Sequence, residues 1–159
     1  MKDDPFARAH KMLRAGLWQE ALHAVYDADT HSIRQAWRFD ENHAWYVAGD
    51  VWYRQGDYAS ARRAFLRALD VRPDDLDALT ALANCYSELG EPDRAEQTLR
   101  NALQHDPGNA DLIYNLGNAL FDQGKFEQAI GEYVLVADLE SEVGELAKRN
   151  IIVANERMS

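Results

Sequence analysis

Few residues of this chain have the types and spacing that catalysis or metal binding would need. Gly117 and the pair Gly124-Lys125 resemble a phosphate-binding loop. Such a loop has four residues between its glycines and Ser or Thr after the lysine, whereas six residues intervene here and Phe126 follows. The five histidines form no His-x3-His pair, and Cys85 is the only cysteine, which disfavours a zinc site. We therefore expect no enzymatic activity, no metal and no cofactor.

Three carboxylates lie close together at Asp74, Asp75 and Asp77, where a helix is expected to begin. A calcium loop would need a longer alternating series of oxygen ligands. Acidic side chains stabilise the N-terminus of a helix, so we assign this cluster to helix capping rather than to a cation site. Cys85 falls at a helix-packing position, where cysteine acts as a small inert apolar residue.

Charge and composition narrow the choice of partners and of compartment. The net charge is -10, and most of it lies beyond residue 41, so no basic stripe is available for nucleic acid and a basic protein partner is favoured. No stretch approaches the roughly 20 apolar residues of a membrane span, and no apolar run follows the first methionine. With a single cysteine, these features predict a cytoplasmic protein that binds neither nucleic acid nor membranes.

The elements that would position any binding residues repeat with a period of 34 residues. The repeat is visible in glycines, in small residues and in large apolar residues that keep one register. The positions are Gly56, Gly90 and Gly124; Ala61, Ala95 and Ala129; Gly49, Ala83 and Gly117; and Phe65, Leu99 and Tyr133. A 34-residue period predicts stacked helical hairpins, since one helix pair cannot bury its apolar face alone.

These residues resemble the tetratricopeptide repeat (TPR) family, whose pattern runs from an aromatic residue through a Leu-Gly-like pair, alanines and a final proline. The resemblance implies an all-α fold, a right-handed superhelix of antiparallel helix pairs whose first helices line a concave groove. We predict one TPR domain over residues 1–159. Its parts are a degenerate first repeat (2–35), an insertion (36–41), three repeats (42–75, 76–109 and 110–143) and a capping helix (144–159).

The first repeat is the weakest match. A helical stripe that includes Val25, Tyr26, Ile33 and Trp37 predicts that its second helix runs long. Trp37 and Phe39 are expected to pack against this repeat. In the third repeat Ser141 replaces the final proline, which is a departure from the family pattern.

The face of each first helix that would line the groove follows from spacings of i, i+3, i+7 and i+10. The predicted groove residues are His43, Tyr46, Asp50 and Tyr53; Asp77, Thr80, Asn84 and Ser87; and Asp111, Tyr114, Asn115, Asn118 and Phe121. This set is aromatic and acidic, with asparagine at a repeated position. Asparagine can bond the backbone of an extended peptide, and aromatic rings offer flat contact area at low entropic cost.

These residue types predict a peptide ligand that carries Lys or Arg together with apolar side chains. TPR domains that hold the acidic C-termini of large heat-shock chaperones use Lys, Asn and Arg as a carboxylate clamp. Here Tyr46, Asp50, Ala81, Asp111 and Asn115 occupy the corresponding positions, and the acidic ones would repel a carboxylate.

The leading hypothesis is thus an adaptor or scaffold that binds a peptide or protein segment in the concave groove. One alternative is a dedicated chaperone similar to the class II type III secretion chaperones, which are also acidic TPR proteins of this size. Another is an immunity or inhibitor protein that blocks an enzyme by surface complementarity. The identity of the partner would separate these three possibilities.

Overall fold

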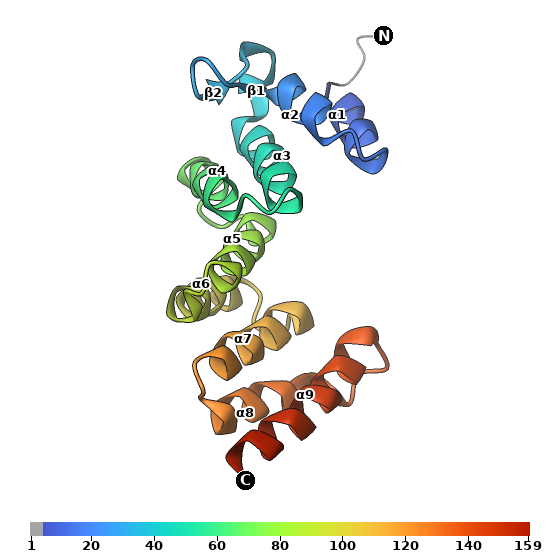
Figure 1. Cartoon of the computed structure of the whole chain (residues 1–159), viewed down its shortest axis with the longest axis vertical. Coiled ribbons are helices and arrows are strands. Elements are labelled where there is room, and N and C mark those ends of the chain that lie inside the picture. The colour runs from blue at the N-terminus through green and yellow to red at the C-terminus, as the bar shows by residue number, and fades with distance from the viewer. Residues whose placement is uncertain (1–4) are drawn as a thin grey trace. The chain divides into compact units, whose positions relative to one another are not determined.

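The computed structural model describes residues 5–159 and is largely helical (Figure 1). Two short strands and a 3-10 helix interrupt the helices near the N-terminus. In chain order the elements are α1 (Pro5–Arg14), α2 (Trp18–Val25), β1 (Tyr26–Asp27), β2 (Ser32–Ile33), η1 (Gln35–Asp40), α3 (Glu41–Arg54), α4 (Tyr58–Val71), α5 (Leu76–Glu88), α6 (Pro92–His105), α7 (Ala110–Asp122), α8 (Phe126–Ala137) and α9 (Glu142–Met158). The prediction of an all-α TPR fold is confirmed.

Polar side chains at the starts of the helices satisfy backbone N–H groups that have no partner inside the helix. In each case a side-chain oxygen accepts a hydrogen bond from the N–H three residues later, which is the usual geometry of an N-cap. These caps are Asp40, Asp57, Asp75, Asn109 and Ser141. Asp75 thereby fulfils the capping role that we predicted for the acidic cluster.

Glycines at the repeat period end the first helix of each pair. The φ angle of Gly56 is 78°, in the left-handed region that glycine adopts without steric cost. Gly56 N donates to Tyr53 O and Asp57 N donates to Trp52 O, so the last carbonyls of α3 are satisfied by a Schellman motif. The same pair of bonds recurs at Gly16, Gly90 and Gly124. The need for a left-handed residue at this turn therefore explains why glycine recurs at the end of each first helix.

The described chain consists of two compact units, the first ending at residue 85 and the second covering residues 86–159, and each is considered by itself. In the first unit, α3 packs against α4 at Gly49. A Cβ atom at Gly49 would lie 2.6 Å from the ring of Phe65, closer than real contacts allow. The predicted role of this small residue, to let two helices approach closely, is confirmed.

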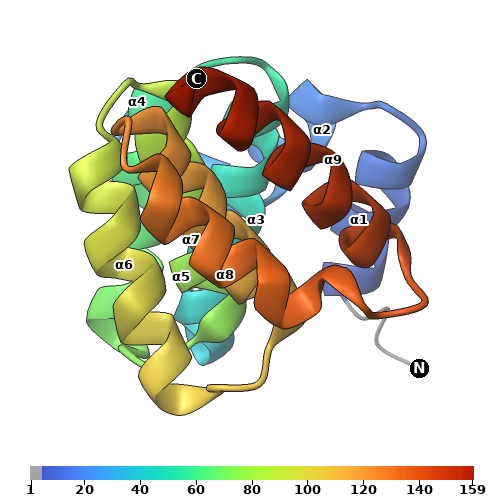
Figure 2. The same ribbon diagram turned by 90° about the horizontal axis from the view of Figure 1, so that it is seen from below.

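In the second unit α7 packs against α8, and α9 lies along α8 and also contacts α7 (Figure 2). Gly117 is pressed against the ring of Tyr133, which is fully buried. This contact repeats the one at Gly49 and Phe65 one unit earlier. The helix over residues 142–158 thus packs on the preceding pair through its own buried residues Ala147 and Ala154.

The prediction that the second helix of the first repeat runs long is wrong. The helix ends at Val25, and Tyr26–Asp27 pairs with Ser32–Ile33 in an antiparallel ladder. The Asp27 carboxylate accepts hydrogen bonds from the N–H groups of Asp29 and Thr30. Such local bonds offer the backbone an alternative to the helix. Residues after the turn then donate hydrogen bonds to the last carbonyl groups of α2, which have no partner within the helix.

Three carbonyls at the end of α2 accept those donors. Arg34 Nε donates to His23 O and Trp37 Nε1 donates to Ala24 O, both at 2.7 Å, and the backbone N–H of Arg34 donates to Val25 O. The insertion therefore closes the helix that precedes it.

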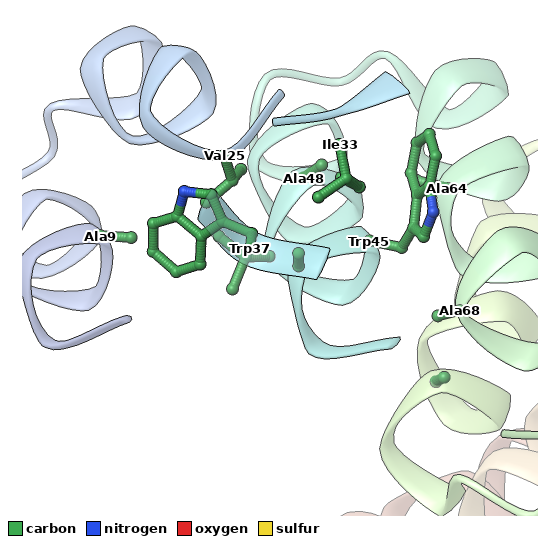
Figure 3. Packing of buried hydrophobic residues seen from close by; sticks show 11 residues of the cluster. Ala9, Val25, Ile33, Trp37, Trp45, Ala48, Ala64 and Ala68 are labelled. Carbon is green, nitrogen blue, oxygen red and sulfur yellow. The ribbon is translucent and has the colours of Figure 1, made fainter. Parts of the chain in front are cut away.

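Trp37 packs into the core of the first unit, as predicted, with an exposed fraction of only 3%. Its ring lies between Ala9 of α1 and Val25 of α2, close to Ile33 (Figure 3). Phe39 is different, because 70% of it is exposed although its ring meets Phe6 at 5.5 Å between centroids. The prediction of packing is confirmed for Trp37, and Phe39 remains mostly in solvent.

Gly117→Ala and Gly131→Ala test the close contact between α7 and α8. Both changes add one methyl group within a helix, but no atom lies within 4 Å of a Cβ at Gly131. We expect Gly131→Ala to raise the free energy of unfolding by about 0.5–1 kcal/mol through helix propensity. Gly117→Ala should instead lower it by about 1–3 kcal/mol through overpacking against Tyr133. Urea unfolding followed by circular dichroism measures both, and equal stabilities would show that the contact is not tight.

Candidate functional site

The predicted groove residues lie on α3, α5 and α7, and none of their side chains is fully buried. Asp77 and Asp111 are exposed, and the others are half-buried. The boundary between the two compact units falls between Asn84 and Ser87. The residues are therefore described in two groups, one on each unit.

In the first unit the negative charges of aspartates from two helices act on Tyr46. Burial raises the pKa of the Tyr46 hydroxyl, and the negative charges of Asp50, Asp77 and Asp75 raise it further. Asp50 lies on α3, whereas Asp75 and Asp77 belong to the start of α5. The tertiary structure thus places one aromatic side chain under the influence of carboxylates that are 25 and 27 positions apart in sequence.

The ring of Tyr46 packs beside two other rings, those of Phe65 and His43. Its centroid is 5.6 Å from that of Phe65 in α4, and 6.3 Å from the stacked ring of His43. Asp50 makes an ion pair of 2.9 Å with Arg54, in which the arginine side chain is 52% exposed. An exposed pair of this kind contributes little to stability, so a ligand cation can replace Arg54 at small cost.

The first helix α1 extends the aromatic surface beside His43. The Nε2 atoms of His10 and His43 are 2.9 Å apart, and the ring of Phe6 meets His43 edge-on at 4.5 Å. Since one imidazole must donate and the other accept, the bond requires at least one neutral ring. Burial lowers the pKa of His43, and the positive charge of His10 lowers it further, against the opposing effect of Asp40 and Asp75.

In the second unit the predicted residues Tyr114 and Asn118 are already hydrogen bonded to α9. Asn150 Nδ2 donates to the Tyr114 hydroxyl at 3.1 Å and to Asn118 Oδ1 at 3.0 Å. The Tyr133 hydroxyl donates to the same Asn118 oxygen at 2.8 Å. The asparagine that sequence spacing assigned to a ligand therefore holds the C-terminal helix on this face.

The remaining predicted residues make local contacts. Thr80 donates its hydroxyl hydrogen to Leu76 O within α5. The Tyr53 ring meets Tyr58 at 5.2 Å, and the Phe121 ring meets Phe126 at 5.1 Å. In both aromatic pairs the partner is the first residue of the next helix.

Sequence reasoning missed Phe6 and His10, which lie beside His43 on the first unit, and Asn150, which bonds Tyr114 and Asn118 on the second. A signal existed for His10, which precedes His43 by 33 positions, close to the repeat period. Phe6 lies in the degenerate repeat, where the register is hard to assign. Asn150 has no counterpart in the repeats, so only the packing of α9 reveals its role.

Comparisons with known proteins agree with this architecture. The family model described as the cytochrome c-type biogenesis protein H TPR domain matches residues 32–142. The chain is 30% identical over 106 residues to the type IV pilus assembly protein PilF of Pseudomonas aeruginosa. This alignment covers 66% of the present chain and 42% of PilF. The chain spans 21%, 16% and 42% of the length of three curated relatives.

Two solved structures show the same fold at low sequence identity. MamA, residue 41 to its end, from Desulfovibrio magneticus RS-1 has a TM-score of 0.74 at 21% identity, with 97% of this chain and 89% of that chain covered. The first TPR domain of Spaghetti (RPAP3), bound to the HSP90 peptide SRMEEVD, has a TM-score of 0.67 at 21% identity, with 74% and 92% covered.

Within the described residues, no helix combines the length and the apolar character that crossing a membrane requires.

The lowered pKa of His43 predicts how stability depends on pH. The unfolded chain binds a proton at His43 near its ordinary pKa of about 6.5, whereas the folded protein resists it, so stability should fall as pH drops below that value. His43→Gln should show a smaller loss of stability between about pH 7.5 and pH 5.5 than the wild type.

Urea unfolding at the two pH values measures this difference. His105→Gln is the control, because His105 is an exposed residue at the end of α6. An unchanged pH dependence in His43→Gln would show that the His10–His43 pair does not couple protonation to folding.

Proposed function

The chain belongs to the family of the cytochrome c-type biogenesis protein H TPR domain, and from this premise we propose that it is an adaptor whose acidic, aromatic face binds peptide segments carrying Lys or Arg. TPR domains are protein-interaction modules without catalytic machinery, and the general role of this chain is that of an interaction scaffold. The peptide specificity is the part that we add.

One observation carries the proposal: the half-buried Tyr46 ring, packed beside Phe65 and His43, lies within the electrostatic influence of three aspartates from two helices. A lysine or arginine side chain placed there would meet both a negative potential and the face of an aromatic ring. An exposed cation–π contact contributes roughly 0.5–1 kcal/mol, and carboxylates strengthen the attraction. Phe6, His43 and the exposed Phe39 would accept apolar side chains of the same segment.

The negative charge of this face favours a ligand whose charge is opposite to that of the peptide bound by one structural neighbour. The TPR domain of Spaghetti (RPAP3) holds the peptide SRMEEVD, which has more acidic than basic residues. On the present chain Asp50 and Asp77 would repel such a peptide.

The second unit carries the predicted groove residues Asp111, Asn115 and Phe121 on α7 and Ser87 at the end of α5, which are considered separately from the face around Tyr46. Asn115 is half-buried and can offer both a donor and an acceptor to a peptide backbone. Tyr114 and Asn118 would reach a ligand only by exchanging their bonds with Asn150. We therefore propose that the first unit provides most of the specificity.

A labelled peptide in which lysine alternates with phenylalanine tests the proposal, with a glutamate–phenylalanine peptide for comparison. The double variant Asp50→Asn, Asp77→Asn should weaken binding of the lysine peptide by about tenfold, because an ion-assisted bond contributes about 1.5 kcal/mol or more. Fluorescence anisotropy measures the affinity, which should also fall as salt rises.

The matched control is Asp138→Asn, Glu140→Gln, which changes the net charge equally at two exposed positions between α8 and α9. It should bind as the wild type does. Full affinity in the Asp50, Asp77 variant, or no affinity of the wild type for the lysine peptide, would exclude this face as the site.

A further inference from the structure

A second candidate site lies on the first unit, where the hairpin of residues 26–33 meets α3 and α4. A surface cavity of about 530 Å³ opens there. Its lining consists of Tyr26, Ala28, His31, Trp45, Trp52, Ser60, Arg63, Ala64 and Arg67. The volume is within the range of pockets that bind ligands, and none of the predicted groove residues contributes to it.

The walls of the cavity are aromatic. Trp45 and Trp52 are seven positions apart on α3, hence on one side of that helix. Tyr26 of β1 meets Trp52 edge-on at 4.9 Å and Trp45 at 6.0 Å. Tyr46 and Tyr53 follow the tryptophans by one position, so the helix presents a different set of aromatic side chains on a neighbouring face.

The rim of the cavity is cationic. Arg63 and Arg67 are one turn apart on α4 and are both exposed. The nine described lining residues include these two arginines and a histidine but no carboxylate, although the chain as a whole has a net charge of -10. Arg63 donates to the Ser60 hydroxyl at 2.9 Å, and Arg67 lies 4.0 Å from an exposed Asp70 carboxylate. These weak contacts leave the guanidinium groups able to bind a carboxylate in a bidentate manner.

The hairpin of residues 26–33 forms one side of the cavity. Tyr26, Ala28 and His31 come from the hairpin that replaces the expected continuation of α2. His31 has a φ of 51°, a left-handed conformation that a non-glycine residue adopts only when its neighbours hold it. The Tyr26 hydroxyl provides one such contact, 2.9 Å from His31 Nδ1. The hairpin therefore presents a fixed edge to the cavity.

The lining has the length of a short peptide segment. Ser60, Arg63, Ala64 and Arg67 follow one stripe of α4 over seven residues, which is about 10 Å at the rise of an α-helix. Three residues of an extended peptide span about the same distance. Alternate side chains of such a peptide point to opposite sides, so an acidic residue can face the arginines while an apolar one meets the tryptophans.

We propose that this cavity is a second peptide-binding site, selective for acidic segments that carry an aromatic or aliphatic side chain. Its charge preference is opposite to that of the face around Tyr46. The two sites would let one unit contact both basic and acidic segments of a partner, or of two partners. The inference stands on the cavity alone, so it does not depend on whether the face around Tyr46 binds peptides.

The test uses the full chain and a labelled seven-residue peptide in which glutamate alternates with phenylalanine. Arg63→Glu, Arg67→Glu should weaken binding by about tenfold or more, since two charge-assisted bonds are lost and two repulsions are introduced. Lys148→Glu, Arg149→Glu is the matched control, with the same change in net charge at two exposed positions of α9. Circular dichroism shows whether each variant is folded.

Amide chemical shifts locate the bound peptide independently of the variants. Changes centred on residues 26–33 and 60–67 are expected. The proposal is overturned by any of four results: no binding, equal affinity in the double arginine variant, shifts centred on Tyr46 and Asp77, or preference of this cavity for the lysine peptide. Self-association that the arginine reversal abolishes would also overturn it, because the occupant would then be a second copy of the chain.

Discussion

The close approach of paired helices at a glycine is the contact on which the other features depend. Gly49 admits the ring of Phe65 and Gly117 admits the ring of Tyr133, at positions where no Cβ could fit. Each buried ring in turn supports a tyrosine of the first helix, Phe65 beside Tyr46 at 5.6 Å and Tyr133 beside Tyr114 at 5.7 Å. The packing contact and the position of the candidate binding residues are therefore one arrangement, used once in each unit.

The two units use this arrangement differently because the ring differs. Phe65 has no polar atom, so Tyr46 keeps its hydroxyl among aspartates. Tyr133 has a hydroxyl that bonds Asn118, and Asn118 also accepts from Asn150 of α9. The hydroxyl group that Tyr133 has and Phe65 lacks is therefore part of the hydrogen-bond network that joins α9 to α7 and α8.

The segment between α2 and α3, residues 26–40, has two consequences. It satisfies the carbonyls at the end of α2 through Arg34 and Trp37, which lets that helix stop early. It also places Tyr26 and His31 opposite the arginines of α4, where a regular repeat would have only a short turn. A segment that completes the fold of a degenerate repeat therefore also creates a cavity whose charge is opposite to that of the chain.

The sequence alone determined the repeat, the helix class and the places where the helices of the regular repeats end. A left-handed glycine acts over a few residues, and Gly56, Gly90 and Gly124 recur every 34 residues. The identity of the family follows from this regular part of the chain.

Only the tertiary structure decided what is not periodic. The hairpin after Val25 forms because the Asp27 carboxylate and the donors of residues 34 and 37 act together, and no propensity of the isolated stripe shows this. The partner of Asn118 is likewise 32 positions away on a helix outside the repeat pattern. The gathering of Asp50, Asp75 and Asp77 at Tyr46, and of aromatic and cationic side chains at the insertion, depends on long-range packing. Spacing predicts which face of a helix a residue occupies, but the neighbours on that face come from other helices.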